Sequence, residues 1–382
     1  MSFAVALSEA ESTADAAAAV ADDLAGALDA GGPAALVFFA TAAHLDAMDL
    51  LAATLADRLA PEVVLGAGAV SVIAEGRELE ETPAVAAWAA PLDAAVPVRL
   101  NPALSADHSP TDDLPLLDEQ PRTLLLLADP FSCPADRLLE QLGTEFPQVR
   151  AIGGLASASG SAGGNRLVLD GEVFDDGAVG LLLGSEAEVE TVVSQGCRPI
   201  GQPYVVTHGE RNLIHELGGR PALERLQEIV EGLDPSERAL VQRGLHLGIV
   251  VNEHKLDFGR GDFLVRGVLG LERQTRALAV GDMVETGTTV QFQVRDAASA
   301  RQDLRGLMAG RSAGGALLFT CNGRGRRLFE VADQDASVVA GAIAPAPLAG
   351  MFCAGEIGPV GPRSYLHGFT ASIALFGQGA AP

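Results

Sequence analysis

Apolar residues follow two spacings along the chain, and their alternation predicts an α/β protein. Continuous apolar runs predict buried strands at 34–41, 63–73, 84–92, 123–130, 315–320, 348–354 and 369–376. Apolar residues at helical spacing predict helices at 8–29, 43–61, 133–146, 221–232, 235–242 and 333–342. Strands that alternate with helices pack as α/β layers.

Other segments carry strand signals of a different kind. The pair Asp170-Gly171 lies between alternating residues and predicts a tight hairpin turn. Residues 188–210 read as extended chain interrupted by Gly and Pro, and 245–253, 262–272 and 288–296 predict antiparallel strands. We therefore expect an α/β fold with mixed sheets rather than a purely parallel one.

One order of elements recurs along the chain. A strand, a polar loop, a helix and a glycine-rich strand end follow one another at 35–73, 123–158 and 316–357. The recurrence has two interpretations, a true internal duplication or the ordinary rhythm of an α/β chain.

Length and charge narrow the class of protein. A chain of 382 residues has room for two or three domains. Its net charge of −24 disfavours nucleic acid and anionic membrane surfaces as partners. Residues 1–24 carry acids where a signal peptide needs an apolar core, and four widely spaced cysteines indicate reduced thiols. These features predict a soluble, cytoplasmic protein.

Charged, amide and thiol side chains follow the ends of two predicted strands. Strands joined by one helix run parallel, so 321–325 and 355–359 are expected at one sheet edge, where open α/β sheets hold ligands. Arg324 presents a planar fork that suits a carboxylate or a phosphate, and Glu356 suits an amine. The candidate ligand-binding residues here are Cys321, Asn322, Gly323, Arg324, Gly355, Glu356, Gly358 and His367.

Each of these residues also has a structural interpretation. Arg324 and Glu356 can pair with each other and brace two loops, and cysteines at strand ends are often small buried hydrophobes. A second Cys-Arg segment adds Gln195, Cys197 and Arg198, which line the same pocket, a related one, or simply a strand-end turn.

Common catalytic and cofactor motifs are absent from the sequence. Residues 66–71 give only part of a dinucleotide-binding motif, and 153–164 are glycine-rich but lack the GK[ST] of a P-loop. There is no GxSxG, no HExxH and no Cys/His spacing for a metal, so we expect no cofactor and no metal.

Several long segments resemble the FIST family. In chain order they are "AIGGLAS", "SQGCRPIG", "ELGGRPALERL", "LLFTCNGRG" and "GEIGPVGPRSYLHGFTAS", which is the order in which the family has them. The resemblance implies an N-terminal helical segment at 1–31, a FIST N-like domain at 32–215, a FIST C-like domain at 216–376 and a tail at 377–382. The family often has Gly-Cys-Ser where this chain has Gly66-Ala67-Gly68, so any role of that thiol is missing here.

The resemblance implies an intracellular sensory protein that binds a small ligand, with a separate molecule as signalling output. From the residues we expect a carboxylated metabolite such as an amino acid. Two alternatives stay open: an enzyme with Cys321 as nucleophile and His367 as base, and an interaction module without a small ligand. Non-enzymatic binding is the preferred hypothesis.

Overall fold

The computed structural model describes residues 2–28, 32–92, 94–101, 111–115, 122–255, 257–272 and 274–377. The chain forms two compact units, each described by itself below. The first comprises 1–193, 304–366 and 370–382, and the second 194–303 and 367–369. Residues 215 and 216, where the sequence predicts a domain boundary, both lie in strand β16 of the second unit, so the compact units divide the chain differently.

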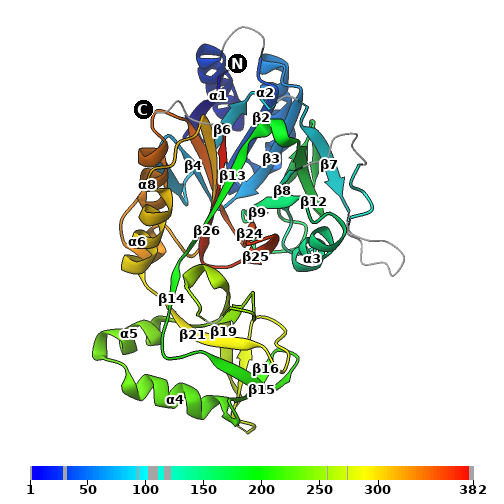
Figure 1. Ribbon diagram of the computed structural model, residues 1–382. Helices are drawn as coiled ribbons and strands as arrows, with labels where there is room; N and C mark the ends of the chain where they lie inside the picture. The colour runs from blue at the N-terminus through cyan, green and yellow to red at the C-terminus, as the bar shows by residue number, and fades with distance from the viewer. Residues whose placement is uncertain are drawn as a thin grey trace. The chain divides into compact units, whose positions relative to one another are not determined.

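The first unit contains three six-stranded sheets built on the same plan (Figure 1). Two parallel strands joined by a helix form the centre of each. These pairs are β2 (Ala35–Thr41) with β3 (Val63–Ala69), β8 (Thr123–Ala128) with β9 (Arg150–Leu155), and β22 (Gly315–Cys321) with β23 (Leu348–Cys353). Their helices are α2 (Met48–Leu59), α3 (Ala135–Glu145) and α8 (Gln334–Ile343). The order predicted three times is thus a structural repeat, and the α/β class with mixed sheets is confirmed.

Two antiparallel strands extend each sheet on one side of the central pair. The inner strands are β6 (Val85–Ala90), β12 (Ala178–Leu183) and β26 (Thr370–Phe376). The outer strands are β1 (Ala4–Ser8), β7 (Val96–Leu100) and β13 (Val189–Gln195).

A hairpin completes the other side of each sheet, and it comes from a different repeat. Hairpin β4 (Ser71–Ala74) and β5 (Arg77–Glu80) follows β3 but pairs with β23. Hairpin β10 (Leu167–Leu169) and β11 (Glu172–Phe174) follows β9 but pairs with β3. Hairpin β24 (Glu356–Val360) and β25 (Arg363–His367) follows β23 but pairs with β9. The three repeats therefore interlock in a cycle.

The inner faces of the three sheets share one apolar core. It includes Phe39 of β2, Leu127 of β8 and Phe319 of β22, all fully buried. The outer faces are covered separately: α1 (Thr13–Ala27) and α2 pack on the β2 sheet, α3 on the β8 sheet, and α8 with the end of α6 (Ala297–Met308) on the β22 sheet. Residues that alternate along a strand thus face either the shared core or a helix.

The structure corrects several predicted elements. Residues 4–8 form an edge strand, and the first helix begins at Thr13, where Ser12 caps it, rather than at residue 8. The run 63–73 is two strands in different sheets, β3 and β4, rather than one. Residues 355–368, between the predicted strands 348–354 and 369–376, contain hairpin β24–β25, which was not predicted. The helix α6 was not predicted, and most of the predicted tail, 378–382, lies outside the described residues.

The second unit is an antiparallel sheet that closes on itself, because strands from its two sides pair with each other. Its strands are β14 (Cys197–Pro199), β15 (Tyr204–Glu210), β16 (Leu213–Leu217), β17 (Arg220–Pro221), β18 (Leu245–Val250), β19 (Phe263–Glu272), β20 (Ala277–Val280) and β21 (Thr289–Arg295). Pairing of β18 with β21 closes the ring around a core that includes Phe292 and Leu247. Helices α4 (Ala222–Gly232) and α5 (Pro235–Arg243) belong to this unit. The antiparallel strands predicted here are confirmed.

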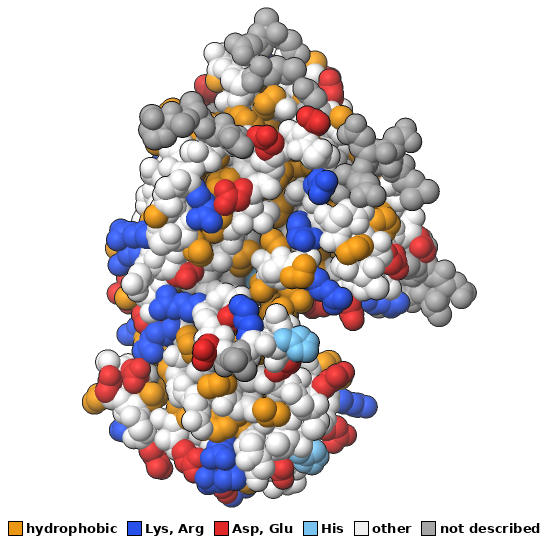
Figure 2. All heavy atoms as spheres, in the orientation of Figure 1, with side chains coloured by type: hydrophobic (Ala, Val, Ile, Leu, Met, Phe, Trp, Pro, Cys, Tyr) orange, Lys and Arg blue, Asp and Glu red, His pale blue; other side chains and the backbone are white. Residues whose placement is uncertain are grey.

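No helix among the described residues is both long enough and apolar enough to cross a bilayer. Figure 2 shows Asp and Glu side chains intermixed with Lys and Arg over one face of the protein.

Candidate functional site

The ends of β22 and β23 meet in register, as predicted. Cys321 lies opposite Cys353, and the Asn322 amide donates to the Cys353 carbonyl at 3.0 Å, which continues the ladder beyond the strand. Strand β24 contacts β22, so Glu356 reaches this edge from the neighbouring sheet. The two predicted loops therefore lie close together.

Five polar or sulfur-bearing side chains at this edge point toward the shared core. Leu317, Phe319, Ala349 and Met351 face that core, and the period of two places Cys321 and Cys353 on the same face. By the same period Thr370 and Ser372 of β26 and Glu356 of β24 also face inward, since Ala374 does so and Ile357 faces outward. We call these five residues, Cys321, Cys353, Glu356, Thr370 and Ser372, the inner polar cluster.

Glu356 is the only fully buried carboxylate of the inner polar cluster. The backbone N–H and the hydroxyl of Thr370 donate to its Oε2 at 3.0 and 2.9 Å. Its Oε1 is buried and has no hydrogen-bond partner among the described residues. Burial raises the pKa of Glu356 to about 8, against the lowering effects of the Thr370 hydrogen bonds, Arg324 and Cys321. The carboxyl is therefore mostly protonated at neutral pH.

Two more oxygen atoms at this edge lack partners. The Oδ1 of Asn322 and the Oγ of Ser372 are buried, with no hydrogen-bond partner among the described residues. The Gly323 amide donates to the Cys321 sulfur at 3.4 Å. Such unsatisfied buried acceptors are uncommon in folded proteins and often mark a functional site.

The two cysteines differ in their surroundings. Cys321 is partly exposed, whereas Cys353 is fully buried. Burial raises the pKa of Cys353 well above its ordinary value, with Glu356 and Cys321 as further contributions. A Cβ at Gly154 of β9 would lie 2.3 Å from the Cys353 sulfur, so the glycine makes room for this thiol.

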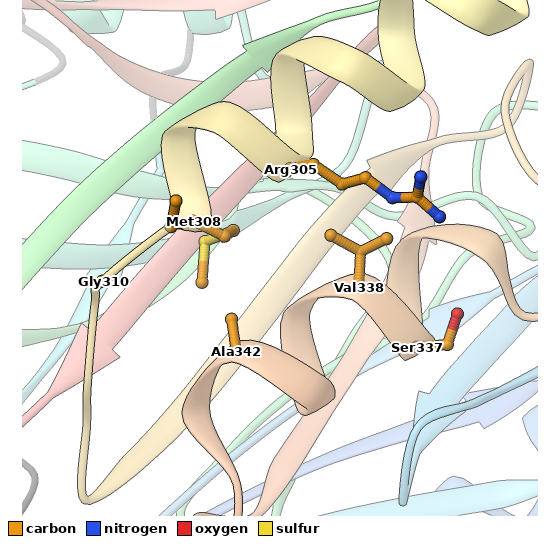
Figure 3. Close-up of a pocket in the computed structure, with 7 residues that line it drawn as sticks. Arg305, Met308, Gly310, Ser337, Val338 and Ala342 are labelled. Carbon is orange, nitrogen blue, oxygen red and sulfur yellow. The ribbon is translucent and has the colours of Figure 1, made fainter. Parts of the chain in front are cut away.

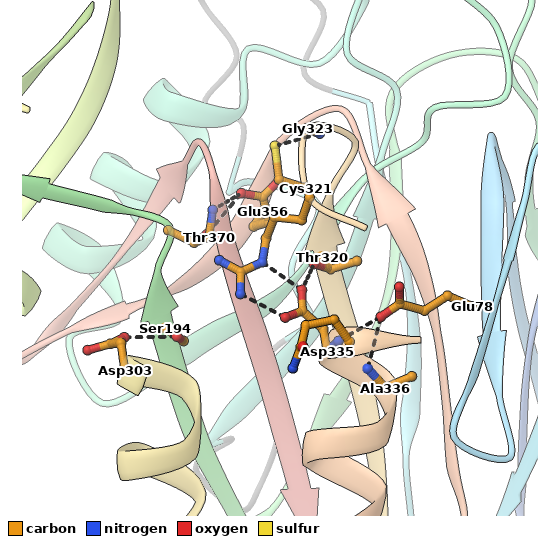
Figure 4. Close-up of polar contacts among 12 residues, drawn as sticks. Glu78, Ser194, Asp303, Thr320, Cys321, Gly323, Asp335, Ala336, Glu356 and Thr370 are labelled. Carbon is orange, nitrogen blue, oxygen red and sulfur yellow. Dashed lines mark hydrogen bonds and ion pairs between the residues drawn. The ribbon is translucent and has the colours of Figure 1, made fainter. Parts of the chain in front are cut away.

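Arg324 is buried in an ion pair with Asp335 of α8 (Figure 4). Its Nε donates to Asp335 Oδ2 at 2.6 Å, its Nη2 donates to Oδ1 at 2.8 Å, and the Thr320 hydroxyl also donates to Oδ2 at 2.8 Å. Burial alone lowers the pKa of Arg324, but Asp335 outweighs it and the pKa is raised. From the sequence, a ligand carboxylate or Glu356 was the expected partner of Arg324; the carboxylate that binds it is Asp335.

Glu78 of β5 lies beside Asp335 and supports the same ion pair (Figure 4). Its Oε1 accepts from the backbone N–H groups of Asp335 and Ala336 at 2.8 and 2.9 Å, which caps the start of α8. Burial, followed by the charge of Asp335, raises the pKa of Glu78 to about 7. Because β5 comes from the first repeat, the cap links two repeats.

The remaining candidate residues of this edge have structural contacts. Gly355 accepts through its carbonyl from the Leu155 amide at 2.8 Å. A Cβ at Gly358 would lie 2.6 Å from Val193 and 2.8 Å from Ser372 Oγ. Both glycines therefore permit close packing between strands.

Four other predicted residues belong to the second unit. The backbone N–H of Gln195 donates to Asp303 at 2.9 Å, as does the Ser194 hydroxyl at 2.8 Å (Figure 4). Arg198 pairs with Asp296 at 2.9 Å and with Glu237 at 3.1 Å. Cys197 and His367 are buried. The structure thus divides the predicted set between the two units.

Two pockets lie on the surface of the described part of the first unit. A groove of about 380 Å³ between α6 and α8 is lined by Arg305, Met308, Ala309, Gly310, Ser337, Val338 and Ala342 (Figure 3). A pocket of about 280 Å³ near β5 is lined by Glu9, Arg77, Glu78, Leu79, Glu80, Thr82, Arg326, Ala332 and Asp333. Within the described ranges no group of three or more His, Cys, Asp or Glu is arranged to hold a metal ion.

Comparison with known proteins places this interlocked α/β chain in a family. A model of the FIST N domain matches residues 34–220, and a model of the FIST C domain matches 222–359. The chain belongs to the FIST family, whose domains are regarded as small-ligand-binding sensory domains in signal transduction.

Its relatives include mycobacterial proteins of matching length. "Uncharacterized protein Rv0628c" of Mycobacterium tuberculosis is 47% identical over 377 residues, 95% of each chain. "Uncharacterized protein Mb0898c" of Mycobacterium bovis is 46% identical over 376 residues, 95% of this chain and 94% of the relative.

Four residues of this region were not predicted from the sequence. Asp335 had a visible signal, an acid in the first turn of a predicted helix just after the arginine loop. Glu78, Gly154 and Thr370 had none, because their positions depend on strands paired across the repeats.

Proposed function

We propose that this protein is an intracellular sensory protein that binds a small carboxylated metabolite with an amine, such as an amino acid, between the inner polar cluster and the adjoining Asn322. One observation carries the proposal. Glu356 Oε1 and Asn322 Oδ1, on adjoining strand ends, are buried oxygens with no hydrogen-bond partner among the described residues. A ligand that donates N–H bonds would satisfy both.

The protonation of Glu356 adds a chemical expectation. An ammonium group near a carboxyl favours its ionised form, and the pKa of Glu356 starts at about 8. Binding of an amine therefore releases a proton, and affinity increases as pH rises toward 8. Arg324, fixed by Asp335, acts as a positioning residue that holds the 321–325 loop and adds positive charge near the cluster.

Thermal melting against matched small molecules tests the proposal. The probes are L-amino acids, the corresponding 2-oxo acids, which lack the amine, and the corresponding amines. Ligand at a hundred times its Kd adds roughly 2.7 kcal/mol to the free energy of unfolding. We expect an amino acid to raise the Tm of the wild type, and we expect its 2-oxo acid to leave the Tm unchanged.

Variants then assign the effect to the cluster. Glu356→Gln and Asn322→Ala should lose the Tm shift, whereas Arg327→Ala, a substitution of an exposed residue, should keep it. An equal shift in all proteins, or a flat response to every amino acid, would reject this site as the binder.

A second candidate function is a thiol-dependent enzyme. It is supported by the partly exposed Cys321, whose side chain lies close enough to Glu356 to influence its pKa. His367, the base considered from the sequence, lies in the second unit. Iodoacetamide alkylation distinguishes the two functions: fast, selective labelling of Cys321 at neutral pH supports an enzyme, and slow labelling opposes it.

A further inference from the structure

Cys321 and Cys353 are in-register neighbours on parallel strands. Such neighbours have Cα atoms about 4.8 Å apart, the spacing between adjacent strands. Disulfides join Cα atoms that are roughly 4.4 to 6.8 Å apart. The backbone spacing at this pair therefore permits a cross-link.

The two side chains also point the same way. Phe319 and Met351, two residues before each cysteine, both face the shared core. Residues at a period of two share a face, so the Cys321 and Cys353 side chains leave their strands on the same side. Cys321 is the last residue of β22, and a strand end can shift more easily than a strand centre.

The pair has the asymmetry of an attacking and a resolving thiol. Cys321 is partly exposed and can meet a small oxidant, whereas Cys353 is fully buried behind it. Both are thiols in this structure. The Arg324 guanidinium interacts electrostatically with Cys321, which places a cation near the attacking sulfur.

We propose that Cys321 and Cys353 form an oxidisable dithiol site whose substrate is a hydroperoxide. The Cys321 sulfur attacks the terminal peroxide oxygen, so that an S–O bond forms and the O–O bond breaks. The sulfur becomes a sulfenic acid, and the peroxide is reduced to an alcohol, or to water for hydrogen peroxide, with the thiol proton. The Cys353 sulfur then attacks the Cys321 sulfur, an S–S bond forms, and hydroxide leaves and takes up the Cys353 proton as water.

Glu356 is placed to handle the proton of the second step. Its carboxyl acts electrostatically on Cys353 and lies near Cys321. At neutral pH it carries a proton that it gives to the leaving hydroxide, and it then receives the proton of Cys353. The carboxyl is thereby restored and no net proton is consumed.

This site does not depend on the proposed ligand. Amino-acid binding requires the oxygens of Glu356 and Asn322, whereas oxidation requires the two sulfurs and is only assisted by Glu356. Each proposal can therefore fail without the other. Cys133 is a suitable comparison thiol, because it is buried and its burial raises its pKa to about 12.

Treatment of the full-length protein with hydrogen peroxide tests the inference. The wild type, Cys353→Ala and Cys133→Ala are oxidised, blocked with N-ethylmaleimide and mapped by peptide mass spectrometry. We expect a Cys321–Cys353 cross-linked peptide in the wild type and in Cys133→Ala, lost on reduction. In Cys353→Ala, dimedone should label Cys321 several-fold more than in the wild type, because no second thiol consumes the sulfenic acid.

Two results would overturn the proposal. One is a wild type that forms no Cys321–Cys353 cross-link in hydrogen peroxide. The other is dimedone labelling of Cys321 that is equal with and without Cys353. If Cys353→Ala fails to fold, the peptide map of the wild type decides alone.

Discussion

The Arg324 guanidinium and the Asp335 carboxylate form a bidentate, fully buried ion pair, with N–O distances of 2.6 and 2.8 Å. The pair joins the loop after β22 to the first turn of α8. A planar guanidinium that is satisfied in this way fixes the loop geometry.

Removal of one partner should therefore destabilise the protein. We expect Arg324→Ala or Asp335→Ala to lower the free energy of unfolding by about 3 to 5 kcal/mol, because the other charge stays buried and unpaired. Urea denaturation measures this. The control Arg327→Ala, at an exposed pair with Glu81, should change it by ~1 kcal/mol or less.

A double replacement separates charge from packing. Arg324→Met with Asp335→Leu leaves no unpaired charge, so it should recover much of the loss seen in the single variants. If Arg324→Ala is as stable as Arg327→Ala, the ion pair is not structural, and the guanidinium is available for a ligand.

The pKa of Glu356 predicts a pH dependence of stability. The folded protein holds this proton up to about pH 8, whereas the ordinary value is 4.5. Between these values the folded state binds more protons than the unfolded state, so the contribution to stability is full below 4.5 and is lost as pH rises to 8.

Comparison with Glu356→Gln isolates this effect. From pH 5 to 8 the wild type should lose up to roughly 1.4 kcal/mol per pH unit relative to the variant. Glu78 is present in both proteins, so its own raised pKa cancels in the difference. Glu140→Gln, at an exposed helix position, should show no such trend, and a flat difference for Glu356→Gln would mean that the carboxyl is ionised in the fold.

Gly154 predicts a steric coupling with Cys353. An alanine Cβ there would lie 2.3 Å from the Cys353 sulfur and 3.1 Å from its Cβ. Gly154→Ala should therefore cost about 1 to 3 kcal/mol, as overpacking does. Cys353→Ala in the same chain removes the sulfur and should restore most of the loss.

A glycine in open space is the control. Gly26, in α1, has no atom within 4 Å of an added Cβ, so Gly26→Ala should stabilise the helix by roughly 0.5 to 1 kcal/mol. Additive effects of Gly154→Ala and Cys353→Ala in chemical denaturation would show that the two residues are not in contact.

Glu78 predicts a capping effect across repeats. Glu78→Ala leaves the N–H groups of Asp335 and Ala336 without their acceptor, and we expect a loss of about 1 to 2 kcal/mol. Glu78→Gln keeps an acceptor oxygen and should lose less, and Glu62→Ala, at an exposed position, should be near neutral. Equal losses for Glu78→Ala and Glu78→Gln in urea denaturation would argue against the cap.

Local sequence signals predicted the central elements well. The apolar runs of β2, β8 and β22 and the helices after them were found, because a buried parallel pair leaves a continuous hydrophobic pattern. The parallel direction of β22 and β23 followed from chain order alone. The proximity of 321–325 and Glu356 could therefore be predicted from the sequence.

The residues that contact the site from remote strands were harder to predict from the sequence. Val63 to Ala74 reads as one apolar run, yet it divides at Val70 between two sheets. Nothing local tells that β4 pairs with β23, or that β24 pairs with β9. Glu78 and Gly154 come to the site through such remote pairings, so no pattern near Arg324 or Glu356 could point to them.

The cyclic exchange of hairpins also affects how the protein can be made. As the chain leaves the ribosome, hairpin β4–β5 emerges long before β23, the strand that receives it. The β9 edge likewise waits for β24, among the last strands to be synthesised. The β8 sheet and the β22 sheet therefore stay incomplete until translation is nearly finished. A chain that ends before β23 lacks both the β4–β23 and the β24–β9 pairing. Truncated products should therefore be recognised by proteases and chaperones as unfolded.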